Sequence, residues 1–260
     1  MFPACSGSVP AAPTSLPPAL ARETADIETS SEGYAGRFAG PVGRWLLAEQ
    51  ERATARLLAG IPGRRVLDVG GGHGQLVRPL LDRGYDVTVF GSDPVCGARL
   101  AAEPGGAGWR FEWGDLLALP YADRAFDLVV SYRLLPHVTR WEALVAELCR
   151  VADRAVLVDF PTTASLNVLT PRLFGLKKRL EGNTRPYTLF READVERVFA
   201  ASGFRLTGRA PQFTLPMVLH RTLRAPALSA AAEALCRGAG LTERYGSPVI
   251  VRMERVERRP

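Results

Sequence analysis

The chain lacks paired cysteines, long apolar runs and, except at two positions, lysine. Its four cysteines lie far apart without a C-x-x-C pair, which excludes a thiolate metal site or redox motif of recognisable spacing. No stretch of about 18 residues is apolar throughout, and the first 21 residues hold five prolines and no basic region. The sequence therefore predicts neither a membrane span nor a secretory signal, and we expect a cytoplasmic protein with reduced thiols.

The charge balance is basic and depends on arginine. The 33 basic residues include only two lysines, Lys177 and Lys178, and 27 acidic residues leave a formal net charge of +6. Such a share of arginine is as typical of GC-rich coding as of function, and the net charge permits an anionic partner without showing one. With 260 residues, 47% of them hydrophobic, the chain can form one sizeable α/β domain or two small ones.

The apolar pattern divides the chain into three parts. Residues 1–30 are rich in Ala, Pro, Ser and Thr without an apolar period, which predicts a disordered tail. Residues 31–62 predict an N-terminal helical flap, since proline stands where a helix would begin and glycine where it would end. Residues 63–260 predict an α/β core with irregular cap insertions at 161–189 and 211–245.

Short apolar runs alternate with helical patterns along the core. This alternation implies right-handed crossovers and a parallel sheet covered by helices on both faces, so the predicted fold class is α/β with a doubly wound, mostly parallel sheet. The helix before the fifth run has Thr139 and Glu142 at the spacing of a capping box. The expected strands are Arg65–Val69, Asp86–Gly91, Trp109–Trp113, Phe126–Ser131, Ala155–Phe160, Phe204–Arg209 and Pro248–Met253.

A glycine cluster follows the first expected strand. Gly70, Gly72 and Gly74 give the pattern G-x-G-x-G, with Asp68 two residues ahead of it. Small residues there let the backbone approach a ligand and present free amide groups at a helix N-terminus. The spacing differs from the dinucleotide-binding G-x-G-x-x-G, and the loop alone is a weak signal.

Two acidic residues follow the next two strands. Asp93 comes 19 residues after Gly74, where an acid can accept hydrogen bonds from both hydroxyls of a ribose, although Asp-Pro is also ordinary turn chemistry. Asp115 follows the third strand, where a carboxylate can accept from the exocyclic amine of adenine, cap a helix or lie in a solvated loop. With the glycine loop upstream, we favour the ligand role for both.

Together these motifs resemble those of the class I methyltransferases that use S-adenosyl-L-methionine. The resemblance is strongest for the small-molecule branch that includes the ubiquinone and menaquinone methyltransferases, also called methyltransferase type 11. It implies a Rossmann-like sheet of seven strands, with the last strand antiparallel and inserted between the fifth and the sixth. The stretches that carry it are Asp68–Gly74, Asp93, Gly114-Asp115, Phe126–Val130 and Ala201–Phe204.

The resemblance also implies roles for residues around the cofactor. The glycine loop passes under the methionine and ribose parts, and Arg37 lies near the methionine carboxylate. Asp93 holds the ribose, Asp115 contacts the adenine, and Tyr132 lies beside the methionyl portion. The residues expected to bind the cofactor are Arg37, Asp68, Gly70, Gly72, Gly74, Asp93, Pro94, Asp115, Leu116, Ser131 and Tyr132.

Methyl transfer from a sulfonium is an in-line displacement, and a hydroxyl nucleophile often needs a general base. His137 follows the fourth strand on the substrate side, and we predict it as that base, with a structural role as the alternative. Tyr34 in the flap is the second predicted catalytic residue, as in relatives that pair a loop histidine with an N-terminal tyrosine; its alternative is aromatic packing. His73 is expected to pack or face solvent, and His220 has no recognisable partner spacing.

Motifs of several other methyltransferase branches are missing. Residues 131–134 read S-Y-R-L where adenine and glutamine-amide methyltransferases have Asn/Asp-Pro-Pro-Tyr, and no Pro-Cys nucleophile stands where cytosine carbon methyltransferases need one. Ser131 and Asp159-Phe160 stand where catechol-type enzymes place metal-binding residues. We therefore predict no catalytic metal.

The insertions bear on the substrate. Between Arg172 and Arg191 the sequence has a strong local excess of basic residues, which favours either an anionic group on the acceptor or a solvated basic helix face. The apolar run Phe213–Leu219, followed by Arg221 and Arg224, favours a hydrophobic pocket or a peripheral contact with a membrane surface.

We predict a methyltransferase that acts on a small-molecule substrate, with an oxygen nucleophile on an anionic or hydrophobic metabolite. Two alternatives stay open. One is an RNA methyltransferase that uses the basic insertion, although the sequence shows no RNA-binding module. The other is a cofactor-binding protein without catalysis. The identity of the substrate, the methylated atom (oxygen, nitrogen or carbon) and the oligomeric state do not follow from the sequence.

Overall fold

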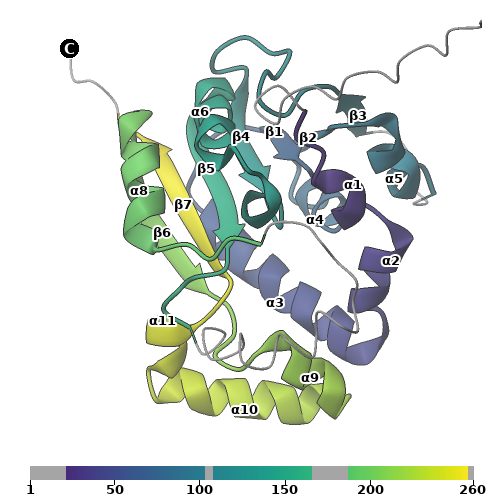
Figure 1. The fold of residues 1–260 in the computed structure, drawn as a ribbon, viewed down its shortest axis with the longest axis vertical. Helices are drawn as coiled ribbons and strands as arrows, with labels where there is room; N and C mark the ends of the chain where they lie inside the picture. Colours follow the sequence, from purple (N-terminus) through teal and green to yellow (C-terminus); the bar gives the residue numbers. More distant parts are fainter. Residues whose placement is uncertain (1–21, 103–107, 166–186, 257–260) are drawn as a thin grey trace, which may run out of the picture.

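A seven-stranded sheet forms the centre of the molecule (Figure 1). The computed structural model describes residues 22–102, 108–165 and 187–256. The strands are β1 (Arg65–Val69), β2 (Asp86–Gly91), β3 (Trp109–Trp113), β4 (Phe126–Ser131), β5 (Ala152–Phe160), β6 (Phe204–Pro211) and β7 (Val249–Arg255). Their order is β3-β2-β1-β4-β5-β7-β6, with β7 antiparallel to both neighbours. The predicted fold class and the insertion of the last strand between the fifth and the sixth are confirmed.

The strand bounds follow the apolar runs closely. β1 to β4 have the predicted bounds at both ends. β5 begins three residues before its predicted start, because α6 (Trp141–Val151) ends directly before it. β6 and β7 each continue two residues beyond their predicted ends, since their antiparallel pairing extends over both strands.

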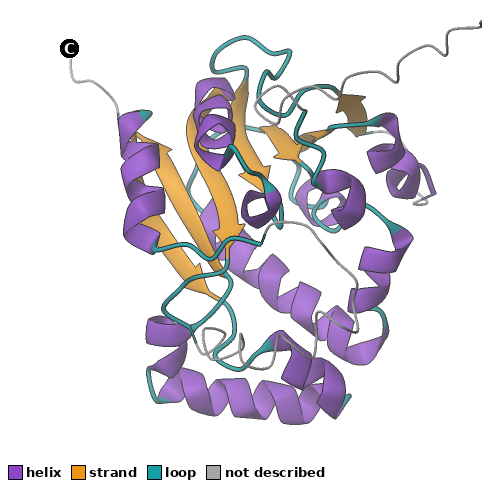
Figure 2. Cartoon of the chain, in the orientation of Figure 1, coloured by secondary structure: helices purple, strands orange, loops and turns teal. Residues whose placement is uncertain are grey.

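Helices cover both faces of the sheet (Figure 2). On one face, α6 and α8 (Glu192–Ala201) pack on the strands, and on the other face α3 (Gly40–Leu58), α4 (Val77–Leu81) and α5 (Ala98–Ala102) do so. Along β4 the side chains alternate between the two cores, with Val129 in the first and Leu128 in the second. Strands buried on both faces read as continuous apolar runs, which is why the sequence pattern found them.

Short helices and the second insertion lie near the carboxyl ends of the parallel strands. The short helices are α1 (Asp26–Thr29), α2 (Glu32–Ala35), η1 (Gly36–Phe38), η2 (Pro94–Gly97) and η3 (Leu135–His137). The second insertion, predicted to be irregular, is helical: it forms α9 (Met217–Leu223), α10 (Pro226–Gly238) and α11 (Leu241–Tyr245) (Figure 1). Among the described residues, no helix is long and apolar enough to cross a membrane.

The N-terminal segment is folded from Arg22 onward, so the predicted tail boundary at residue 30 is wrong. The Asp26 side chain is fully buried, and its Oδ2 accepts the Ser92 N–H at 2.7 Å and the Cys96 thiol at 3.3 Å. The Arg22 Nη2 donates to the Ser92 carbonyl oxygen at 2.7 Å. One helical turn fixed by long-range polar contacts has no apolar period, so the sequence pattern could not reveal it. Residues 1–21 lie outside the described residues.

The predicted capping box before α6 is also wrong. Arg140 is the N-cap residue and no side chain within the predicted box caps the helix. The Arg140 N–H instead donates to Glu23 Oε1 at 3.0 Å. A carboxylate from the N-terminal segment therefore takes the place near the positive end of the helix that the local motif was expected to fill.

Candidate active site

The glycine loop joins β1 to α4 and is tightly enclosed. Gly70 has a φ of +76°, a backbone conformation that favours glycine, and its N–H donates to the Phe90 carbonyl oxygen at 2.8 Å. At Gly72 a Cβ would lie 2.3 Å from both the Cys96 carbonyl oxygen and Ser30 Oγ. The loop therefore packs against the N-terminal segment and η2 at a distance that only glycine permits.

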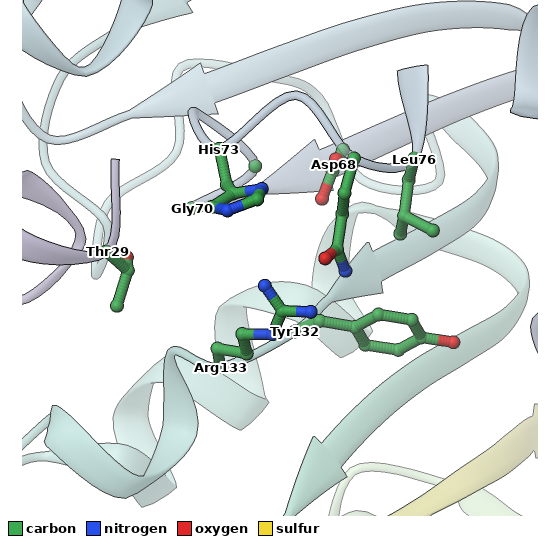
Figure 3. A pocket seen from close by; sticks show the side chains of 9 residues that line it. Thr29, Asp68, Gly70, His73, Leu76, Tyr132 and Arg133 are labelled. Carbon is green, nitrogen blue, oxygen red and sulfur yellow. The ribbon is translucent and has the colours of Figure 1, made fainter. Parts of the chain in front are cut away.

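A pocket lies under this loop, at the carboxyl ends of β1 and β4 (Figure 3). Its walls come from α1, the glycine loop and the turn after β4. The lining residues are Thr29, Asp68, Gly70, Gly71, His73, Gln75, Leu76, Tyr132 and Arg133. Three residues predicted to bind the cofactor, Asp68, Gly70 and Tyr132, are thus brought together in one pocket.

Arg133 supplies the positive charge of the pocket. Its guanidinium points toward the glycine loop, while the ring of Tyr132 points away (Figure 3). The Arg133 Nη2 donates to Gln50 Oε1 at 2.6 Å, and its Cζ lies 4.1 Å from the centre of the Phe38 ring. Its Nη1 is buried and has no hydrogen-bond partner among the described residues. A guanidinium held in this way is suited to bind a carboxylate.

Two buried carboxyl groups lie near this guanidinium. Asp159 accepts the Arg133 backbone N–H at 2.5 Å and Gln50 Nε2 at 3.1 Å. Burial raises the pKa of Asp68 to about 7 and the pKa of Asp159 to about 6, and the charge of Arg133 opposes both shifts. Asp68 therefore titrates near neutral pH, and a cation in the pocket would favour its ionised form.

The flap residue Tyr34 lies beside the loop. Its ring centre is 6.0 Å from that of His73 and 5.8 Å from that of Phe38. Burial raises the pKa of Tyr34 and lowers the pKa of His73 to about 3. At neutral pH the tyrosine therefore keeps its proton and the His73 imidazole is neutral, with both ring nitrogens unpartnered within the described part of the chain. His73 packs, as expected, and also lines the pocket.

The residues predicted to bind adenosine follow β2 and β3. Asp93 and Asp115 each accept the backbone N–H two residues further on, both at 2.9 Å. Pro94 opens η2, and the Leu116 side chain is fully buried. The turn chemistry weighed as an alternative is therefore present, and it uses one oxygen of each carboxylate.

Ser131 and Tyr132 form hydrogen bonds within the protein. Ser131 Oγ donates to the Val69 carbonyl oxygen at 2.9 Å, and the Tyr132 hydroxyl lies 2.9 Å from Thr54 Oγ1 on α3. Burial raises the pKa of Tyr132. These bonds fix the end of β4 against β1 and α3, so the two residues shape the wall from which Arg133 projects.

His137 lies at the end of η3, half-buried, on the same turn that carries Arg133. Its ring packs against that of Tyr187, with 5.6 Å between the ring centres. Tyr187 lies within the first predicted insertion (161–189). His137 therefore packs against the described end of that insertion, most of which (166–186) lies outside the described residues together with most of the basic cluster.

Arg37 lies on the outer side of the flap. It is exposed, its Nη2 is 3.7 Å from Glu28 Oε1, and its Cζ is 5.0 Å from the centre of the Tyr34 ring. The arginine that lines the pocket is Arg133, which the sequence analysis considered only as part of a motif missing from other branches. Its position two residues after the fourth strand was the signal that could have found it.

Sequence reasoning also missed a chain of hydrogen bonds behind the pocket, which joins two glutamine side chains to the Asp159 carboxyl group. Gln75 Nε2 donates to Gln50 Oε1 at 2.8 Å, and Gln50 in turn donates to Asp159. The three side chains come from the glycine loop, α3 and the end of β5. Gln50 is a buried polar residue on the otherwise mostly apolar face of α3, and this break in the apolar pattern was the available signal.

The described residues contain no group of three or more His, Cys, Asp or Glu side chains that could hold a metal ion. The absence of a catalytic metal stays a prediction.

The pocket fits the cofactor that the sequence implies. S-adenosyl-L-methionine carries a carboxylate, an ammonium group and a sulfonium. Among the described residues neither Arg133 Nη1 nor Gln75 Oε1 has a hydrogen-bond partner. Arg133 Nη1 suits the carboxylate, whereas Asp68 and Gln75 Oε1 suit the ammonium group. A glycine loop after β1, acids after β2 and β3, and this strand order define a class I methyltransferase.

Comparison with known proteins supports the same class. A family model described as a methyltransferase domain matches residues 67–156. The demethylmenaquinone methyltransferase of Deinococcus radiodurans is 35% identical over 186 residues, which cover 62% of this chain and 76% of that protein. An uncharacterized methyltransferase of Mycobacterium tuberculosis is 34% identical over 124 residues, which cover 46% of this chain and 47% of that protein.

Solved structures share the fold. Magnesium protoporphyrin IX methyltransferase from Synechocystis, with bound SAH, has a TM-score of 0.59 at 19% identity and covers 88% of this chain and 96% of that chain. The cyclase SpnF has a TM-score of 0.52 at 19% identity and covers 79% of this chain and 80% of that chain. At this identity the likeness shows the fold alone.

The chain belongs to the class I small-molecule methyltransferases that use S-adenosyl-L-methionine. The predicted enzyme class and cofactor are confirmed.

Proposed function

We propose that the chain methylates an oxygen nucleophile on a hydrophobic, quinone-sized small molecule. The 35% identity to a demethylmenaquinone methyltransferase over 76% of that protein supports the quinone-sized acceptor. It does not support the oxygen nucleophile, because the methyl group that distinguishes menaquinone from demethylmenaquinone is bonded to a ring carbon. The oxygen nucleophile comes from the sequence, and a quinone in its reduced form offers ring hydroxyls that fit it. The anionic acceptor group stays a separate prediction, because the basic cluster that motivated it lies mainly outside the described residues.

In this proposal the pocket holds the amino-acid end of the cofactor. Arg133 pairs with the carboxylate, and Asp68 and Gln75 accept from the ammonium group. Asp93 accepts from the ribose hydroxyls and Asp115 accepts from the adenine amine. Each uses the carboxylate oxygen that accepts no backbone N–H within its own turn. When bound, the cofactor supplies an electrophilic methyl group on a sulfonium, in line with the acceptor.

His137 and Tyr34 have different roles in the proposal. A general base must reach the acceptor proton and must ionise near the working pH, which an imidazole does. Tyr34 keeps its proton because burial raises its pKa, so it donates a hydrogen bond to the acceptor oxygen and orients it. The rings of Tyr34, Phe38 and His73 also pack together beside the loop and exclude water from this side.

The test is methyl transfer from labelled S-adenosyl-L-methionine to hydroxylated naphthoquinols with and without a prenyl tail. Mass spectrometry and NMR identify the methylated atom. We expect an O-methyl product, a fall in kcat of about 100-fold or more for His137→Ala, and a smaller fall for Tyr34→Phe. The control Tyr245→Phe, on α11, leaves kcat unchanged.

Three results would contradict the proposal. A ring-carbon product would exclude the oxygen nucleophile. Label in RNA and in no quinol would favour the nucleic-acid alternative. Unchanged kcat in both His137→Ala and Tyr34→Phe would remove these residues from the catalytic machinery while leaving the acceptor class standing.

A further inference from the structure

Helix α10 presents its apolar side to solvent. Its exposed apolar positions share one face of the helix: Ala227, Leu228, Ala231, Ala234 and Leu235. Leu228 is 57% exposed and Leu235 is 77% exposed. The opposite, buried face carries the polar residues Ser229 and Glu233. A surface helix of a globular protein has the reverse arrangement, so the outward face of α10 is suited to contact something other than water.

The buried polar face fixes this orientation. Glu233 is fully buried and its carboxylate accepts the backbone N–H groups of Thr214 and Leu215, each at 2.9 Å. Its Oε1 also lies 3.0 Å from Nε2 of His220, whose ring packs on Trp45 with 5.2 Å between the ring centres. Turning α10 to hide its leucines would break these bonds in the interior, so the exposed face is a fixed feature of the fold.

The neighbouring helices extend the exposed apolar surface. Ten large apolar side chains are exposed among the described residues, and six of them lie on α9, α10 and α11. We call these six the apolar cap face: Val218, Leu219, Leu223, Leu228, Leu235 and Leu241. In Figure 1 the three helices lie together at one end of the molecule, opposite the C-terminal end of the described chain.

The charges around the apolar cap face are positive. Arg224 and Arg237 are exposed, and Arg237 lies only loosely, at 4.0 Å, from its acidic neighbour Glu49. The acids on α9, α10 and α11 are Glu233, which is buried, and Glu243, whose Oε1 lies 2.8 Å from Arg209 Nη1. An apolar face with a cationic border complements the surface of an anionic bilayer. A symmetric pairing with a second copy of the same face would oppose arginine to arginine.

We propose that the apolar cap face binds the surface of an anionic lipid bilayer, with Leu228 and Leu235 entering the headgroup region. This binding is independent of the acceptor proposed above. It does place the pocket close to the membrane, because Arg221 on α9 lies over the Phe38 ring, with Cζ 5.4 Å from its centre, and Phe38 packs on Arg133.

The test is flotation of the full chain with phosphatidylcholine vesicles, with and without phosphatidylglycerol. We expect binding to the anionic vesicles, and a partition coefficient at least tenfold lower for the double variant Leu228→Glu/Leu235→Glu, which corresponds to about 1.4 kcal/mol. The double variant Arg224→Gln/Arg237→Gln should lose the preference for anionic vesicles. Val256→Glu, at an exposed apolar position directly after β7, should bind like the wild type.

An unfolding temperature and an S-adenosylhomocysteine affinity equal to those of the wild type would show that the fold of each variant is intact. The proposal is overturned if the wild type does not float with anionic vesicles, or if the leucine variant binds as well as the wild type. It is also overturned if the wild type sediments as a dimer that the leucine variant dissociates, because a second copy then covers the face.

Discussion

Replacing Arg133 by methionine should weaken cofactor binding through one identifiable group, the cofactor carboxylate. Methionine keeps much of the apolar contact with Phe38 and removes the guanidinium. A hydrogen bond to a charged group contributes about 1.5–3 kcal/mol, so the Kd for S-adenosyl-L-methionine should rise about 10- to 150-fold. The same change removes the positive charge that opposes the raised pKa of Asp68 and Asp159.

Calorimetric titration with S-adenosyl-L-methionine and with its decarboxylated form separates these effects. The wild type should bind the carboxylated ligand more tightly, whereas Arg133→Met should bind both with similar Kd, because the group that recognises the carboxylate is gone. Arg37→Met tests the competing expectation from the sequence. Since Arg37 is exposed and near Glu28, we expect Arg37→Met to prefer the carboxylated ligand over the decarboxylated one by the wild-type ratio.

The reasoning is refuted if Arg133→Met still prefers the carboxylated ligand by the wild-type ratio. It is equally refuted if the preference disappears in Arg37→Met, because the flap arginine would then bind the carboxylate. Equal weakening toward both ligands would assign Arg133 to the shape of the pocket and not to carboxylate recognition.

Four further outcomes follow from the geometry. Asp93→Ala should raise the Kd of the cofactor about 10- to 100-fold by calorimetry, with the exposed Asp86→Ala unchanged, because two ribose hydrogen bonds are lost. Asp26→Ala should expose the N-terminal segment to limited proteolysis near residue 30, whereas Asp26→Asn keeps an acceptor oxygen and should be cut more slowly. Glu233→Gln should lower the free energy of unfolding by about 1.5–3 kcal/mol, measured by urea denaturation. Burial raises the pKa of Glu233, but its hydrogen bonds lower that pKa by more, so the pKa lies below its usual value. The stability advantage of the wild type should therefore disappear as the pH falls through the carboxyl range. Burial raises the pKa of Asp68 to about 7, so this carboxyl group ionises as the pH rises to neutrality. Its ionisation should increase the affinity for the cofactor and decrease the stability of the cofactor-free protein. Asp68→Asn should flatten both pH profiles.

The sheet was predictable because the central strands are mainly apolar and buried. β1, β2 and β4 appear as short, mainly apolar runs, whereas the edge strand β3 alternates aromatic and charged residues, and the bounds of all four were predicted correctly. The second insertion was misread because α10 is rich in alanine and has only two charged residues, Glu233 and Arg237. So few polar positions do not mark out an apolar stripe clearly in the sequence.

The site was predictable where it depends on local sequence and not where it depends on contacts between distant residues. Asp68 lies near the end of β1 and the glycine loop follows that strand, and the structure places them together in a pocket. Gln50 and Asp159 are 109 residues apart and meet only in the folded chain. The same holds for Asp26, whose partners lie on the turn after β2.

The buried Asp26 carboxylate has a consequence for biosynthesis. Its hydrogen-bond donor, the Ser92 N–H, stands 66 residues later in the chain, so α1 leaves the ribosome well before the strand that receives it. During translation the Asp26 carboxylate must stay hydrated until β2 has emerged and paired with β1. The first helix of the described residues therefore cannot complete its docking before β2 and the turn that carries Asp93 have emerged.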